Sequence, residues 1–187
     1  MDTPPIATPI ATPIAMPIVV ISAVGRDKPG IIAALARALL DLGGNLDDIS
    51  MTRLHGAFAA MVAARLPLGT TENDARAALA PVALEMGLTV TVQSVPDAHA
   101  DAPPDTLLTV YGADHPGIVH AIAAVLAAAG ANITDMDTRL TGSPASPVYV
   151  MLLEVAAGGA EMAESLAELG RSLGVDIRAC ALDAEAL

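Results

Sequence analysis

The hydrophobic positions of this chain fall into two successive series of short runs that follow the same order. The first series opens with residues 18–24, IVVISAV, whose β-branched character and length are typical of a buried strand. A helix is predicted over residues 29–42 because its larger apolar side chains recur on one helical face, and Gly43-Gly44 is a helix stop. These apolar positions are Ile31, Ile32, Leu35, Leu39 and Leu42.

The rest of the first series predicts a hairpin, a second helix and a closing strand. The predicted elements are strands 45–54, 57–66 and 88–95, with a helix within residues 70–87. His55-Gly56 supplies the hairpin turn. Thr70 or Thr71 is the expected N-cap of the helix. Pro81 lies inside the helical pattern, so we expect it to kink the helix or split it in two.

The second series repeats this order. It predicts strands 106–111, 132–140, 148–155 and 174–181, helices 116–129 and 159–173, and a longer loop, TGSPASP, at 141–147. Each series reads β-α-β-β-α-β, which is the ferredoxin-like arrangement of an antiparallel sheet covered on one face by two helices. The fold class expected is therefore α+β, with two such domains in tandem.

Proline-rich segments mark the expected domain boundaries. Residues 1–17 contain a proline about every four residues, and we predict an extended, disordered tail. Residues 96–104, PDAHADAPP, are polar and proline-rich and form the expected linker. The domains are thus predicted to occupy residues 18–95 and 105–182. Units of this size only just bury a core, which favours packing against another unit or chain.

Charge and composition narrow the classes of partner. The formal net charge is −12 and aromatic residues make up 2% of the chain. Nucleic-acid binding relies on Lys and Arg, often with aromatic stacking, so we expect no direct contact with nucleic acid and none with a membrane. Cys180 is the single cysteine, which fits a reducing, cytoplasmic compartment. No apolar run approaches the length of a membrane span, and no signal peptide is recognised.

One motif occurs twice at a spacing of 87 residues: GRDKPGI at 25–31 and GADHPGI at 112–118. Eleven of 24 aligned positions are identical between residues 25–48 and 112–135. A repeat of this length indicates a duplicated domain rather than a solenoid. Any site built on the repeated turn is therefore expected in two copies.

Each residue of the motif has a physical rationale at a strand-to-helix turn. Gly25 permits a sharp turn or the close approach of a ligand. Asp27 is an expected N-cap that accepts from the Gly30 N–H, and Pro29 suits the first helical turn. Gly30 leaves a bare helix N-terminus, which suits a carboxylate or phosphate. The candidate binding residues of the two turns are Gly25, Asp27, Pro29, Gly30 and Ile31, and their equivalents Gly112, Asp114, Pro116, Gly117 and Ile118.

Two asparagines extend this candidate site. Asn45 and Asn132 open the strand that follows the first helix of each series. An amide there can donate to a carboxylate or accept from an ammonium group. An anion-binding turn combined with a polar amide suits a zwitterionic amino acid, although a capped turn and a helix stop would also explain these residues.

Together, the paired G-x-D-x-P-G-I turns and the G-x-N-[LI]-x-D segments that follow resemble a tandem ACT-domain protein. Within that class, the chain resembles the glycine cleavage system transcriptional repressor family over residues 18–182. The resemblance implies binding of a small amino acid at an interface between paired units, by the two turns with Asn45 and Asn132. It also implies action through a protein partner such as a transcription activator. One departure is that Lys28 of the first turn is His115 in the second.

Other functional readings have weaker support in the sequence. His115 and His120 are not at the i, i+4 spacing of a helical zinc pair, so no metal or other cofactor is expected. Adjacent strand residues Asp47 and Asp48 point to opposite faces and cannot readily share a substrate. We therefore expect no catalytic residues, and an enzyme on a ferredoxin-like scaffold is the least favoured alternative. A dimerisation or scaffold module without ligand stays open, and exposed sheet edges favour a homodimer.

Overall fold

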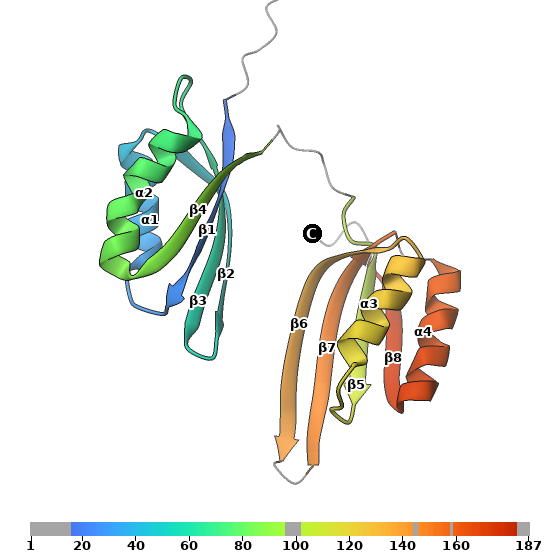
Figure 1. Cartoon of the computed structure of the whole chain (residues 1–187). Helices are drawn as coiled ribbons and strands as arrows, with labels where there is room; N and C mark the ends of the chain where they lie inside the picture. Colours follow the sequence, from blue (N-terminus) through green and yellow to red (C-terminus); the bar gives the residue numbers. More distant parts are fainter. Residues whose placement is uncertain (1–15, 96–101, 144–145, 158, 183–187) are drawn as a thin grey trace, which may run out of the picture. The chain divides into compact units, whose positions relative to one another are not determined.

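The structure is a computed structural model that describes residues 16–95, 102–143, 146–157 and 159–182. The described residues divide into two compact units (Figure 1). The first contains β1 (Ile18–Arg26), α1 (Ile31–Asp41), β2 (Asn45–Leu54), β3 (Ala57–Arg65), α2 (Glu72–Met86) and β4 (Leu88–Val95). The second contains β5 (Thr106–Gly112), α3 (Ile118–Ala128), β6 (Asn132–Ser143), β7 (Ser146–Ala156), α4 (Ala160–Leu173) and β8 (Val175–Ala181).

Each unit has one antiparallel sheet with both helices on the same face (Figure 1). The strand orders are β2-β3-β1-β4 and β6-β7-β5-β8, which is the ferredoxin-like topology predicted from the sequence. Consequently β2 and β4, and likewise β6 and β8, are the edge strands. Within the described segments, no helix combines the length and the apolar character needed to cross a membrane.

The core of each unit is formed by alternate residues of the strands and by one apolar face of each helix. In the first unit, every second residue of β1 and β3 is buried beneath the helices, and the largest buried side chain is Phe58. Ile31, Leu35 and Leu39 supply the α1 stripe, as predicted. In α3, Ile118, Ile122 and Leu126 are buried, whereas Val119 is exposed.

Helix α2 begins as predicted and continues further than expected. Thr71 is its N-cap, and a capping box joins the Thr71 side chain to the Asp74 backbone N–H and the Asp74 side chain to the Thr71 N–H. Of the two effects expected of Pro81, a kink or a split of the helix, the split is wrong, since α2 is continuous from Glu72 to Met86. Pro81 and Ala77 are both on the exposed side, so the Ala77 carbonyl that lacks a donor remains accessible to water.

The two hairpins differ in length. His55 and Gly56 both have positive φ, as a two-residue type I′ turn requires. The second hairpin is longer than predicted because Gly142 pairs with Pro147 and Ser143 with Ser146, so most of the expected loop at 141–147 is strand. Pro147 is compatible with this pairing because β7 extends there beyond β5, which leaves one side of the strand unpaired.

Candidate ligand-binding turns

The repeated turns share a Pro-Gly pair that directs the chain from strand into helix. Gly30 has φ 92° and ψ −4°, and Gly117 has φ 100° and ψ −10°. These are the dihedral angles of the third residue of a type II turn, which favours glycine there and proline before it. Pro29 and Pro116 therefore lie before the N-cap, two residues ahead of the first helical residue, and not in the first helical turn in which they were predicted.

The predicted N-cap role of the motif aspartates is wrong. Gly30 and Gly117 occupy the N-cap positions, and neither α1 nor α3 has a side-chain cap. The inserted turn separates each carboxylate from the helix end. Asp27 instead accepts a hydrogen bond from Arg53 Nη1 at 3.2 Å, and its backbone N–H donates to the Gly56 carbonyl at 3.1 Å.

Helices α1 and α3 consequently begin with free backbone donors. Their first intrahelical bonds run from Ala34 to Gly30 and from Ala121 to Gly117, and neither helix has an acidic residue in its first turn. By contrast, α2 closes its N-terminus with a capping box. An uncapped helix N-terminus presents N–H groups and positive potential to an anion such as a carboxylate.

The first glycine of each motif is required by the protein's own packing. A Cβ atom at Gly25 would lie 2.7 Å from the Gly87 carbonyl oxygen, and one at Gly112 would lie 2.6 Å from Val175 Cγ1. Neither glycine has the positive φ of a sharp turn. The close approach anticipated for a ligand is thus made by the connection between the second helix and the last strand of each unit.

The fourth motif residue has a role that sequence reasoning missed. Lys28 Nζ donates to the Met86 carbonyl oxygen at 2.9 Å, and His115 Nε2 lies 3.1 Å from the Leu173 carbonyl oxygen. Met86 and Leu173 are the last residues of α2 and α4. Both turns are therefore tied to the C-terminus of the second helix, where donors and positive charge are favoured.

The two turns differ in the residue that the sheet register places near their aspartate. The sheet register aligns Gly25 with Phe58 and Arg53, and Gly112 with Tyr149 and Leu140. Arg53, which pairs with Asp27, thus has an apolar counterpart in the second unit. Among the described residues, Asp114 has no hydrogen bond or ion pair.

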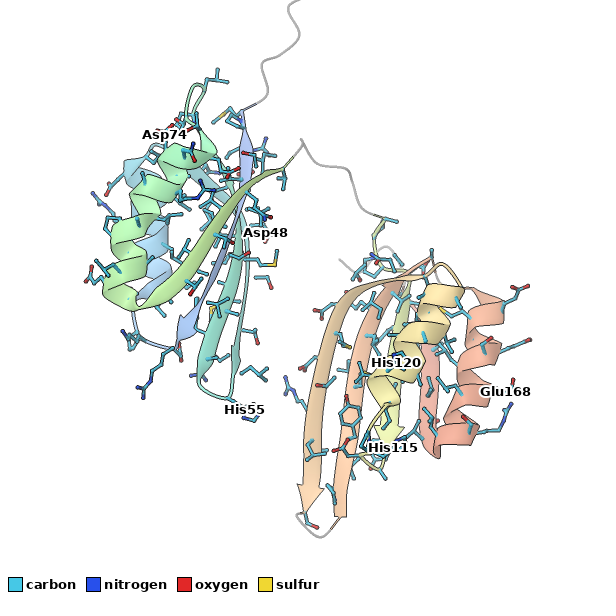
Figure 2. All side chains as sticks on the ribbon, in the orientation of Figure 1. Asp48, His55, Asp74, His115, His120 and Glu168 are labelled. Carbon is cyan, nitrogen blue, oxygen red and sulfur yellow. The ribbon has the colours of Figure 1, made fainter. Side chains whose placement is uncertain are left out.

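An open hollow of about 520 Å³ lies at the second turn. Its lining includes Asp114, Gly117, His120 and Tyr149, and Figure 2 shows His115 at this turn and His120 on α3. Tyr149 is half-buried, whereas its counterpart Phe58 is 1% exposed and belongs to the first core. The second turn therefore combines the uncapped N-terminus of α3, a carboxylate without a partner among the described residues, and an aromatic ring.

Neither asparagine joins the turn of its own unit. Asn45 is aligned with Arg65 and, through it, with Ile18 at the start of β1, whereas Asp27 follows the end of β1. At roughly 3.3 Å per residue, the length of β1 separates them by about 26 Å. Asn132 aligns with Ala156, again at the far end of the sheet. A single unit thus cannot combine the two predicted halves of the site.

Asn45 belongs instead to a surface network. Its Nδ2 donates to Asp47 Oδ1 at 2.9 Å, and Arg65 Nε donates to Asp47 Oδ2 at 2.7 Å. The hydrogen bond from Arg65, followed by that from Asn45, lowers the pKa of Asp47. Elsewhere in the described part of the chain, no group of three or more His, Cys, Asp or Glu side chains is placed to hold a metal ion.

Comparison with known families agrees with the fold and the repeated turn. Family models described as ACT domain match residues 17–93 and residues 106–171, which together make up more than half of the chain. The chain therefore belongs to the ACT-domain family and carries two ACT domains in tandem. A UPF0237 protein of Methanopyrus kandleri is 42% identical over 72 residues, or 38% of this chain and 80% of that protein.

Two solved structures match nearly the whole chain. An unknown protein from Galdieria sulphuraria has a TM-score of 0.80 and 26% sequence identity, covering 90% of this chain and 99% of that one. A candidate glycine cleavage system transcriptional repressor has a TM-score of 0.65 and 16% identity, covering 90% and 98% of the two chains. At that identity, the second likeness establishes a common fold.

Proposed function

We propose that this protein is a cytoplasmic regulatory module that binds a small amino acid of the glycine or serine type. In this proposal it acts on the transcription of genes of amino-acid metabolism through protein contacts, and it catalyses no reaction. Its binding residues are those of the two turns, Gly25, Asp27, Pro29, Gly30, Ile31, Gly112, Asp114, Pro116, Gly117 and Ile118, with Asn45 and Asn132.

The observation that carries the proposal is the arrangement at the second turn. The uncapped N-terminus of α3 suits the carboxylate of an amino acid. The Asp114 side chain, which has no hydrogen bond or ion pair with any described residue, suits its ammonium group. Both lie on the same open hollow, so a zwitterion satisfies opposite charges at neighbouring points. Tyr149 and His120 border the space left for the ligand's side chain.

In this proposal the second turn is the principal site and the first is closed in the unliganded chain. Arg53 already neutralises Asp27, so an ammonium group must displace a guanidinium that is held at 3.2 Å. The two copies of the motif then differ in affinity although their backbones match. Lys28 and His115 occupy equivalent positions and do not account for this difference.

In this proposal the asparagines contribute to the binding site only when a unit of a second chain pairs with the first. Strand β2 ends near the turn of its own unit and begins at Asn45. Antiparallel alignment of the edge strands of two chains would set the Asn45 of one beside the turn end of the other. A homodimer is therefore the assembly in which Asn45 and a turn meet.

The proposed transcriptional role is supported by likeness and by charge. The repressor candidate shares the fold over 90% of the chain. With a net charge of −12 and 2% aromatic residues, the protein is poorly suited to bind DNA itself. A DNA-binding activator is the kind of partner through which such a module would act.

A thermal-shift screen against the twenty amino acids tests the proposal. Because a ligand that binds only the folded state raises the melting temperature, glycine or serine should give a concentration-dependent increase. Asp114→Asn should abolish the shift, and its matched control Asp27→Asn should retain it. No shift with any amino acid would instead favour the scaffold alternative.

A further inference from the structure

The open face of the first sheet carries no charged side chain over its centre. Side chains alternate between the two faces of a strand, and aligned neighbours share a face. The open face therefore holds the positions that alternate with the buried residues of β1 and β3. We call twelve of them the neutral face: Val20, Ser22, Val24, Ser50, Thr52, Leu54, Ala59, Met61, Ala63, Thr89, Thr91 and Gln93.

The equivalent face of the second sheet is charged. It carries ion pairs between Asp137 and Arg139 at 3.0 Å and between Asp176 and Arg178 at 2.9 Å, and Glu154 adds a further charge. This composition is typical of a sheet face in water. The two units share a topology, so the lack of charge on the neutral face distinguishes one copy of the repeat and indicates a face that is covered.

We propose that the neutral face binds the neutral face of a second copy of this chain, so that two first units stack sheet on sheet. A two-fold contact sets a patch against itself, so a projection and the hollow that receives it must share one patch. Met61 is 58% exposed and projects near the centre of this face. Beside it lies a hollow of about 360 Å³ whose lining includes Ser22, Ser50 and Ala59.

The charged side chains of this sheet face lie at its two ends. Arg26, aligned with Ala57, lies at one end, and Asp48 and Arg65 lie towards the other, where Arg65 pairs with Asp47. A two-fold axis that runs across the strands reverses the strand direction and keeps the strand order, so each Arg26 lies over the end of the other copy that carries Arg65 and Asp48, and the neutral centres meet. No like charges meet at the centre, even though each chain carries a net charge of −12.

The area of the neutral face is sufficient for a specific contact. Four strands spaced by about 4.8 Å and about 25 Å long give a face of roughly 20 by 25 Å. Stacking two such faces buries on the order of 1,000 Å² in total, which is at the lower limit of specific interfaces. We therefore expect a concentration-dependent dimer. This inference does not rest on amino-acid binding.

Analytical ultracentrifugation of the full chain over a range of concentrations tests the inference. Met61→Lys should raise the dimer dissociation constant about tenfold or more, because it buries an ammonium group without a partner. Leu152→Lys is the matched control, since Leu152 aligns with Thr109 as Met61 does with Ser22 and is 42% exposed on the second sheet. It should leave the dimer unchanged.

Circular dichroism and melting temperature report whether each variant folds. A wild-type chain that sediments as a monomer at all concentrations would overturn the inference, as would a Met61→Lys dimer as tight as wild type, which would place the contact on a sheet edge.

Discussion

Lys28 donates a hydrogen bond to the carbonyl of Met86, 58 residues further along the chain, and His115 makes the equivalent contact with Leu173 at the same separation. Each contact ties a motif turn to the last residue of the second helix. Substituting Lys28 with Met keeps most of the side-chain length and removes the donor and the charge. We expect it to lower the free energy of unfolding by about 0.3–1 kcal/mol, the usual effect of a cation at a helix C-terminus.

Urea unfolding followed by circular dichroism measures this change. His115→Lys serves as the control, because a lysine there supplies the same donor as Lys28 and should leave stability nearly unchanged. A Lys28→Met chain as stable as wild type would mean that the tie does not contribute to folding.

Removing Arg53 should open the first turn to the amino acid, and placing an arginine at Leu140 should weaken binding at the second turn. Arg53→Ala frees Asp27, so isothermal titration calorimetry with the amino acid found in the thermal-shift screen should change from one to two binding equivalents per chain. Leu140→Arg places a guanidinium at the equivalent register position and should weaken binding at the second turn. The Arg53–Asp27 pair is exposed, so Arg53→Ala should change stability by less than about 1 kcal/mol.

Two outcomes of the titration distinguish a failure of this prediction from a failure of the proposed function. Two equivalents in the wild-type chain would show that Arg53 does not close the first turn, while binding itself stands. No binding to either the wild type or Arg53→Ala would argue against amino-acid sensing altogether.

Acid should destabilise the first unit through two carboxylates at the start of α2. The backbone N–H of Ser94, with help from Arg76, lowers the pKa of Glu72, and hydrogen bonds from Thr71 lower the pKa of Asp74. A lowered pKa means that the folded state favours the ionised form. The resulting stability is present above the ordinary pKa values of 4.5 and 3.8 and is lost as pH falls through the lowered ones.

Urea midpoints measured between neutral pH and about pH 3 check this dependence. Glu72→Gln and Asp74→Asn should each be less stable than wild type at neutral pH, and the difference should narrow in acid. A difference that stays constant with pH would show that ionisation of these groups is not involved.

The glycines of one motif should differ in their tolerance of alanine. A Cβ at Gly112 would lie 2.6 Å from Val175 Cγ1, so Gly112→Ala should cost about 1–3 kcal/mol as overpacking. A Cβ at Gly117 meets nothing within 4 Å, but its φ of 100° disfavours any L side chain, for which about 1–2 kcal/mol is expected. Melting temperatures of the two variants rank these costs, and a larger loss for Gly117→Ala would contradict the steric account.

The order of elements was predictable from the sequence because hydrophobic alternation and helical periodicity are local properties. Thr71 and the His55-Gly56 turn follow from the same short-range chemistry. The roles of Gly25 and Lys28 could not be predicted, because their partners lie about sixty residues away. Asp27 was misassigned as a cap although the Pro-Gly pair that separates it from the helix is itself a local signal of a type II turn. Nothing local indicates that Arg53 reaches Asp27 across the hairpin.

The separation of 58 residues is kept although the segments inside it differ. The second hairpin, residues 132–156, is four residues longer than the first, residues 45–65, and the stretch from hairpin to helix end is four residues shorter, residues 157–173 against 66–86. An insertion in one segment has thus been matched by a deletion in the next. The four extra hairpin residues lie at the tip, where Gly142 pairs with Pro147 and Ser143 with Ser146, whereas Asn132 still aligns with Ala156 as Asn45 does with Arg65. For chimeric proteins, the hairpins alone are therefore exchangeable without displacing the end of the second helix from the motif.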